Sequence, residues 1–252
     1  MEDKKIKEFI KERYSKIATK EDTYNCSCCG DSKEDSTIKQ AQKTGYTMEE
    51  IKNIPADALF GLGCGNPTAL ADIKTGETVL DLGSGGGIDV FLASQKVGDK
   101  GKVIGIDITP KMVETAIKNA KTGRYENVIF KQGENLPIEN STIDVIISNC
   151  VINLTPNKLK AFKEAYRVLK PNGRIIVSDI VTYGKIPLEI RKKFQAWAEC
   201  IGGAQEKQEY IDTIKKAGFN NVKIISEQFF TEHDMDELLI GKILSIQIKA
   251  LK

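Results

Sequence analysis

The period of the hydrophobic positions changes near residue 78 and divides the chain into two parts. In the first part, residues 4–17 carry apolar side chains at helical spacing and predict an amphipathic helix. Residues 19–44 are polar, lack a clear period and contain the run CSCCG, so they predict a loop that is mobile or ordered by a ligand. From residue 78 onward, short apolar runs alternate with segments of helical period.

This alternation predicts the fold class. Strands are expected over 78–83, 102–109, 127–133, 143–149, 173–181, 221–229 and 242–251. Helices are expected over 88–98, 110–123, 157–170 and 206–219. Strand–helix repetition of this kind predicts a doubly wound α/β fold: a mostly parallel sheet with helices on both faces and a last strand that can run antiparallel.

Three local signals add detail to this outline. The run Thr47-x-x-Glu50 resembles a capping box and starts a short helix that must end near Pro55. The run PNG, residues 171–173, predicts a turn before the fifth strand. Between the fifth strand and the last helix lies an insertion, residues 183–206, which contains AECIGGA.

Composition excludes several classes of function. The chain has 252 residues, and its 37 basic and 35 acidic side chains give a net charge of +2, so no nucleic-acid-binding surface is expected. No apolar run reaches membrane-spanning length and the N-terminus is too charged for a signal peptide, so we expect a cytoplasmic, non-membrane protein, monomeric by default. Its six cysteines should then be mostly reduced. The single histidine, His233, excludes most mechanisms centred on a histidine base.

A glycine-rich turn follows the first strand of the alternating part. In VLDLGSGGGID, residues 79–89, glycines would let the backbone approach a ligand closely, and the following helix offers free amides. Ile88 stands where a dinucleotide fingerprint has glycine, so the match to that fingerprint is imperfect. Asp107, at the end of the second strand, is placed to accept hydrogen bonds from ribose hydroxyls. Asp81 would repel a pyrophosphate but suits a cationic amino-acid group.

Lone cysteines stand in three segments that are far apart in the sequence. Cys64 lies in GLGCGNP, Cys150 in SNCVINL at the end of the fourth strand, and Cys200 in AECIGGA after the fifth. Cys150 alone is explained as a small buried apolar residue, whereas Cys200, which precedes Gly-Gly, and Cys64, which lies between glycines in a loop, stand in poor contexts for a core. Because ligands of open α/β sheets bind at the carboxyl ends of the strands, the three thiols can also surround one soft, thiophilic centre.

The glycine turn, Asp107 and the strand order together resemble the class I S-adenosylmethionine-dependent methyltransferases, in which Gly133 and Glu134 would border the adenine. YSKIA, GLGCG, DLGSGGGIDV, SNCVINL, EAYRVLKPNG and WAECIGGA, in this order, are similar to the arsenite methyltransferases. That resemblance implies a seven-stranded methyltransferase sheet and an S-adenosylmethionine cofactor. The residues expected at the cofactor are Tyr14, Asp81, Gly83, Ser84, Gly85, Gly87, Asp107, Ile108, Met112, Gly133, Glu134 and Asn149.

The same resemblance implies the arsenic chemistry. Cys64, Cys150 and Cys200 would hold trivalent arsenic as a thiolate complex, and one of Cys26, Cys28 and Cys29 would enter disulfide exchange during turnover. Thioredoxin or glutathione would then reduce the protein. Three regions are expected: residues 1–70 as an N-terminal helix with cysteine-bearing loops over the site, 71–182 as the Rossmann-like cofactor core, and 183–252 as the arsenic-site insertion with the strands that complete the sheet.

The residues support an arsenic acceptor independently. An oxygen or carbon acceptor generally needs a base to remove its proton, and the acceptor region offers few such bases. Trivalent arsenic has a lone pair and no proton, so the protein needs only to hold it in line with the sulfonium methyl group. Glu199 could orient or accept a proton, or be a surface carboxylate. Two alternatives stay open: a class I methyltransferase of a quinone, lipid or small metabolite with incidental cysteines, and a metalloid-binding protein that does not turn over.

Overall fold

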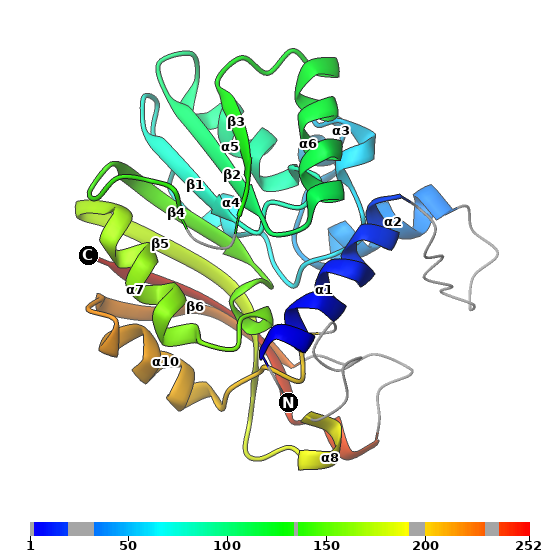
Figure 1. The fold of residues 1–252 in the computed structure, drawn as a ribbon, viewed down its shortest axis with the longest axis vertical. Coiled ribbons are helices and arrows are strands. Elements are labelled where there is room, and N and C mark those ends of the chain that lie inside the picture. Colours follow the sequence, from blue (N-terminus) through cyan, green and yellow to red (C-terminus); the bar gives the residue numbers. More distant parts are fainter. Residues whose placement is uncertain (1–2, 20–32, 134–135, 192–199, 230–236) are drawn as a thin grey trace.

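A computed structural model describes residues 3–19, 33–133, 136–191, 200–229 and 237–252. Its centre is a seven-stranded sheet of order β3-β2-β1-β4-β5-β7-β6 (Figure 1). Strands β1 to β5 are mutually parallel, and β7 is antiparallel to both of its neighbours. The strands are β1 Thr78–Leu82, β2 Lys102–Asp107, β3 Val128–Gln132, β4 Ile143–Asn149, β5 Leu169–Thr182, β6 Asn220–Phe229 and β7 Ile243–Leu251. The predicted fold class is confirmed.

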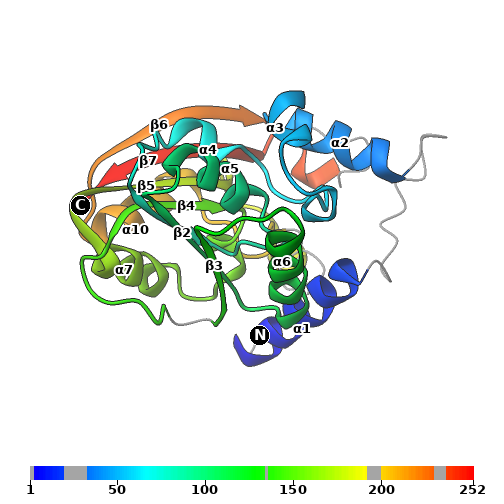
Figure 2. The same cartoon turned by 90° about the horizontal axis from the view of Figure 1, so that it is seen from above.

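The helices cover both faces of this sheet. They are α1 Asp3–Ala18, α2 Lys33–Lys43, α3 Met48–Lys52, α4 Pro67–Leu70, α5 Ile88–Val97, α6 Pro110–Thr122, α7 Lys158–Val168, α8 Leu188–Arg191 and α10 Lys207–Lys216. Successive residues of β1 point to opposite faces: Leu80 packs in a core with α7 and α10, whereas Val79 packs in a core with α5. In Figure 2, α7 and α10 lie together, and α1 lies beside α6.

Helix α2 corrects one prediction. Residues 19–44 were expected to form a loop, but Lys33–Lys43 are helical; residues 20–32 lie outside the described part of the chain. The helix contributes buried Ala41 and partly buried Ile38 to a small core with Tyr46 and Phe91. Two apolar side chains one turn apart are too weak a pattern to predict a helix, and tertiary packing stabilises it instead.

The PNG run, residues 171–173, corrects a second prediction from the sequence. Instead of a turn that precedes the fifth strand, it lies inside β5, which begins at Leu169. Pairing with β4 jumps from Ile143–Leu169 to Val145–Arg174, so the extra residues bulge out of the strand. Asn172 adopts a φ of 65° there, and the backbone of Lys252 bonds to Asn172 and Gly173. The C-terminus therefore supplies the hydrogen bonds that a free turn would lack.

The capping box is confirmed, since Thr47 and Glu50 exchange hydrogen bonds and α3 ends before Pro55. Two short helical turns follow β4 and precede β7: η2 Ile152–Leu154 and η3 Glu237–Leu239. Across the described ranges, no helix has both the length and the apolar character needed to cross a membrane.

Candidate active site

A pocket opens at the carboxyl ends of β1 and β4, where ligands of open α/β sheets bind. Its empty space is about 600 Å³, part of it open to solvent. The glycine turn after β1 forms one wall, and the segment from Ala58 to Gly63 forms another. Among the residues predicted to contact the cofactor, those that line this pocket are Tyr14, Asp81, Gly83, Ser84, Gly85, Met112 and Asn149.

The glycine turn can take its shape only because its residues lack side chains. Gly83, Gly85 and Gly87 have φ values of 70°, 50° and 100°, in the left-handed region that other residues rarely adopt. A Cβ atom on Gly83 would overlap the side chain of Val151, which follows β4. The turn therefore lies directly against the segment that carries Cys150.

Asp107 holds the same turn from β2. Its carboxylate accepts hydrogen bonds from the backbone N–H of Gly85 at 2.9 Å and of Thr109 at 2.8 Å. Burial raises its pKa, and these backbone hydrogen bonds oppose that shift. Asp107, Gly87, Ile108 and Gly133 do not line the pocket itself. Contact with the cofactor stays a prediction for these residues and for those that line the pocket.

Two buried carboxylates set the charge of the pocket. Asp81 is 3% exposed and Asp89 2% exposed, and both line it. Burial raises the pKa of each, and for Asp81 the charges of Asp89 and Asp107 raise the pKa further, to well above its ordinary value. Asp89 accepts hydrogen bonds from the Thr68 hydroxyl at 2.6 Å and the Tyr46 hydroxyl at 3.0 Å. Paired buried acids of this kind favour a cationic ligand.

The sequence alone did not identify Tyr46, Phe60 or Asp89 as site residues. Asp89 had a signal, because it is the second residue of α5 and ends the glycine-rich run. Tyr46 and Phe60 had none: Tyr46 becomes a pocket residue only through its hydrogen bond to Asp89, which is 43 positions further along the chain.

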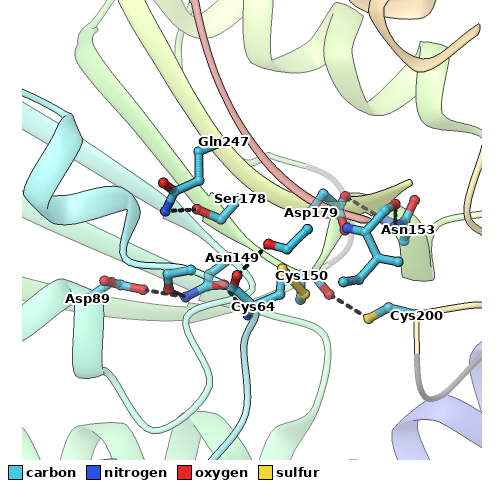
Figure 3. The surroundings of a disulfide bond; sticks show 12 residues. Cys64, Asp89, Asn149, Cys150, Asn153, Ser178, Asp179, Cys200 and Gln247 are labelled. Carbon is cyan, nitrogen blue, oxygen red and sulfur yellow. Dashed lines mark hydrogen bonds between the residues drawn. A yellow bond between two sulfur atoms is a disulfide. The ribbon is translucent and has the colours of Figure 1, made fainter. Parts of the chain in front are cut away.

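The three lone cysteines lie together (Figure 3). Cys64 and Cys150 form a disulfide, with their Cα atoms 6.0 Å apart. Cys200 is buried and takes no part in this disulfide, and its Sγ donates a hydrogen bond to the Cys150 carbonyl at 3.1 Å. The expectation of mostly reduced cysteines is therefore wrong for the first pair. The two loops bring their sulfur atoms within bonding distance.

With this pair bonded, no group of three His, Cys, Asp or Glu side chains within the described residues is placed to ligate a metal ion. The role of Cys64, Cys150 and Cys200 as arsenic ligands stays a prediction. So do the roles of Cys26, Cys28, Cys29, Glu134 and Glu199, which lie outside the described residues.

Asn149 connects the pocket to the disulfide. Its Oδ1 accepts the backbone N–H of Cys64 at 3.0 Å, and its Nδ2 donates to the Gly65 carbonyl at 2.7 Å and to the Tyr46 hydroxyl at 3.0 Å. Because Asn149 also lines the pocket, one side chain contacts both the pocket and the Cys64 loop. Figure 3 shows it between Asp89 and Cys64.

Comparison with known proteins agrees with this geometry. A family described as a methyltransferase domain matches residues 73–229. An arsenite methyltransferase from Halobacterium salinarum is 37% identical over 98% of this chain and 66% of its own length, and the human one is 38% identical over 78% and 55%. A crystal structure titled as an arsenic(III) S-adenosylmethionine methyltransferase from Chlamydomonas reinhardtii matches with a TM-score of 0.70 and 33% identity, over 84% of this chain and 73% of that one.

The chain therefore belongs to the S-adenosylmethionine-dependent methyltransferases with a seven-stranded sheet. Within that class it is a member of the arsenite methyltransferase family. It spans about two thirds of the length of the archaeal relative and about half of the human one.

Proposed function

We propose that this chain transfers methyl groups from S-adenosylmethionine to trivalent arsenic, as arsenite and methylarsenite, and so serves arsenic detoxification. The main support for the proposal is that Cys64, Cys150 and Cys200 lie together beside a pocket lined by two buried acids. Family membership supports it. The alternative of a metabolite methyltransferase assigns no role to three cysteines that meet from distant segments.

The pocket fits S-adenosylmethionine on its own chemistry. Asp81 and Asp89 supply negative charge for a sulfonium or ammonium group, and the buried Ser84 hydroxyl has no hydrogen-bond partner among the described residues. The glycine turn leaves room for close backbone contact, because a Cβ on Gly85 would have only the Met112 sulfur within 4.0 Å. When bound, the cofactor supplies an electrophilic methyl group.

The cysteines hold the substrate in this proposal. Once the Cys64–Cys150 disulfide is reduced, thiolates of Cys64, Cys150 and Cys200 bind trivalent arsenic and leave its lone pair free. Three thiols lose their protons on binding, so the metalloid itself must favour deprotonation of groups whose ordinary pKa is near 8.5. Burial of Cys64 and Cys200 excludes water from the arsenic.

Turnover requires a reductant, because transfer of the methyl group to the arsenic lone pair forms an As–C bond, releases S-adenosylhomocysteine and leaves pentavalent arsenic, which two protein thiolates would reduce to the trivalent state as they form a disulfide. Reduction of the Cys64–Cys150 disulfide takes two electrons and two protons, which a thioredoxin dithiol or two glutathione molecules would supply by thiol exchange. One of Cys26, Cys28 and Cys29 would relay the exchange. We also propose that residues 1–70 cover the site and that the protein acts as a cytoplasmic monomer.

Serine substitutions test the proposal. Cys150→Ser and Cys200→Ser should each abolish arsenite methylation, because a hydroxyl is a poor ligand for arsenic, while the dissociation constant for S-adenosylmethionine stays within about twofold of wild type. The measurements are product analysis by mass spectrometry and calorimetric titration of the cofactor. Full arsenite methylation by either variant would exclude thiolate binding as the mechanism.

A further inference from the structure

A cluster of buried polar side chains lies behind the cysteines and has no part in the chemistry described above. Asp179 is 0% exposed on β5, and buried Tyr210 of α10, Asn153 of η2 and Lys158 of α7 surround it. None of the four lines the cofactor pocket. An ionisable group this deeply buried needs specific partners to be tolerated.

The partners of Asp179 come from three elements. Its Oδ2 accepts the Tyr210 hydroxyl at 2.8 Å and the backbone N–H of Asn153 at 3.1 Å, while its Oδ1 accepts the N–H of Ile180 at 3.0 Å. The Asn153 side-chain amide donates to the Ile180 carbonyl. The carboxylate therefore fixes the η2 turn, which follows Cys150, onto β5 (Figure 3).

The same strand holds Cys150 itself. The N–H of Cys150 donates to the Ser178 carbonyl at 2.8 Å, so residues 178 to 180 bind successive groups of the segment from 150 to 153. Cys150 has a φ of 57° and Cys200 a φ of 63°. A left-handed backbone is strained for a residue with a side chain, and it persists only where its surroundings determine it fully.

The charge on Asp179 is balanced only in part. Burial raises its pKa to about 6, against the opposing effects of the Tyr210 hydrogen bond and the nearby Lys158 ammonium. Lys158 in turn donates to the carbonyls of Asn153 and Thr155 at 3.5 and 3.3 Å, so it holds the same turn from the other side. Burial raises the pKa of Tyr210 well above its ordinary value, and the charge of Asp179 and, least of all, that of Cys200 add to this shift.

We propose that Asp179 and Tyr210 are a positioning pair for the thiol site: they fix the turn after Cys150 in the one conformation that directs its sulfur toward Cys64 and Cys200. Asp179 touches neither substrate nor cofactor in this role and acts through the backbone of Asn153. The identity of the substrate as arsenic rests on the proposed function above. The claim that the pair directs the Cys150 sulfur toward Cys64 and Cys200 does not depend on that function.

Asp179→Asn tests the pair, because it keeps the shape of the side chain while removing the charge and placing an N–H₂ group where donors converge. In reduced protein, we expect the affinity for phenylarsine oxide to fall by about tenfold and the KM for arsenite to rise similarly, while the KM for S-adenosylmethionine stays within about twofold. Tyr210→Phe removes one donor and should shift the first two quantities by about threefold in the same direction. All assays run well below the melting temperature of each variant.

A second readout needs no arsenic. When reduced protein is treated with oxidised glutathione, Cys64 and Cys150 lose two electrons and two protons and form their disulfide, and two glutathione thiols are released. Asp179→Asn should slow this step by about tenfold. Asp144→Asn is the matched control, because Asp144 is the second residue of the neighbouring strand β4 and pairs with Lys170 at 2.8 Å. It should change none of these values.

The outcomes separate the two proposals. If wild-type protein does not methylate arsenite, the proposed function fails, yet the rate of disulfide formation in the variants still decides the positioning role. If Asp179→Asn does not fold, Tyr210→Phe decides it by the same measurements. A lowered melting temperature with unchanged arsenical affinity and an unchanged rate of disulfide formation would show that the pair only stabilises the fold, and would overturn the inference.

Discussion

At the scale of single residues, Asp81 and Asp89 show how burial prepares a site for a cation. Both acids are almost completely buried and both have a raised pKa, so each is more easily protonated than a surface acid. A bound cation would favour the charged form of both. Cofactor binding and ionisation of the acids are therefore linked.

This linkage predicts how the affinity changes with pH. As the pH falls toward the raised pKa values, protonation removes the negative charge, so S-adenosylmethionine should bind progressively more weakly as the pH is lowered from 8. Asp81→Asn should bind more weakly at pH 8 and lose most of the pH dependence. Calorimetric titration between pH 8 and pH 5 measures both, with Asp144→Asn as a control that keeps the wild-type profile. A wild-type affinity that is the same at pH 5 and pH 8 would contradict the assigned role of the acids.

At the scale of elements, β5 binds two segments that lie outside the sheet, one at each end of the strand. Its last residues hold the Cys150 segment, and Arg174 near its start holds the segment before β1. The Arg174 guanidinium donates to the carbonyls of Ala71 and Asp72, each at 2.6 Å, and pairs with Glu77 at 2.7 Å. Its side chain is only 13% exposed, so solvent screens this pair weakly.

Removing this arginine should destabilise the fold without changing the chemistry. We expect Arg174→Ala to lower the free energy of unfolding by about 3 kcal/mol, because Glu77 and two carbonyls lose their partner in a buried setting. Arg174→Lys should lower it less, because a lysine keeps the positive charge, but it should still lower it, because a lysine cannot form the bidentate pair. Urea unfolding measures both, and the KM for arsenite should stay at its wild-type value. A loss below about 1 kcal/mol would mean that the cluster behaves as an ordinary surface pair.

Elements with strong patterns were predictable and elements that depend on distant partners were not. The apolar runs predicted all seven strands, and β1 and β4 are buried along most of their length, as expected of parallel strands covered on both faces. Helix α2 was missed because it has few apolar positions. The start of β5 was missed because Pro171 and Gly173 normally end an element, and the partner that prevents this is Lys252, at the other end of the chain.

At the scale of the whole molecule, the topology assembles the site. Cys150 follows β4 and Cys200 follows β5, and these parallel neighbours end at the same edge of the sheet, so sequence reasoning could predict their meeting. Cys64 precedes β1, and the hydrogen bond from its backbone N–H to Asn149 at the end of β4 brings it to the same edge. Sequence reasoning could not predict the Cys64–Cys150 disulfide, since bonding across 86 positions depends on loop conformations that local pattern does not encode.

The central claim is that arsenic held by these thiols receives the methyl group. The most direct test is mass spectrometry of the products that the purified chain forms from arsenite, S-adenosylmethionine and a thioredoxin reducing system. We predict methylated arsenic in an amount that matches the S-adenosylhomocysteine released, and at most about one turnover when the reductant is omitted. Cofactor binding without any methylated arsenic, or sustained cycling in the absence of reductant, would contradict the account.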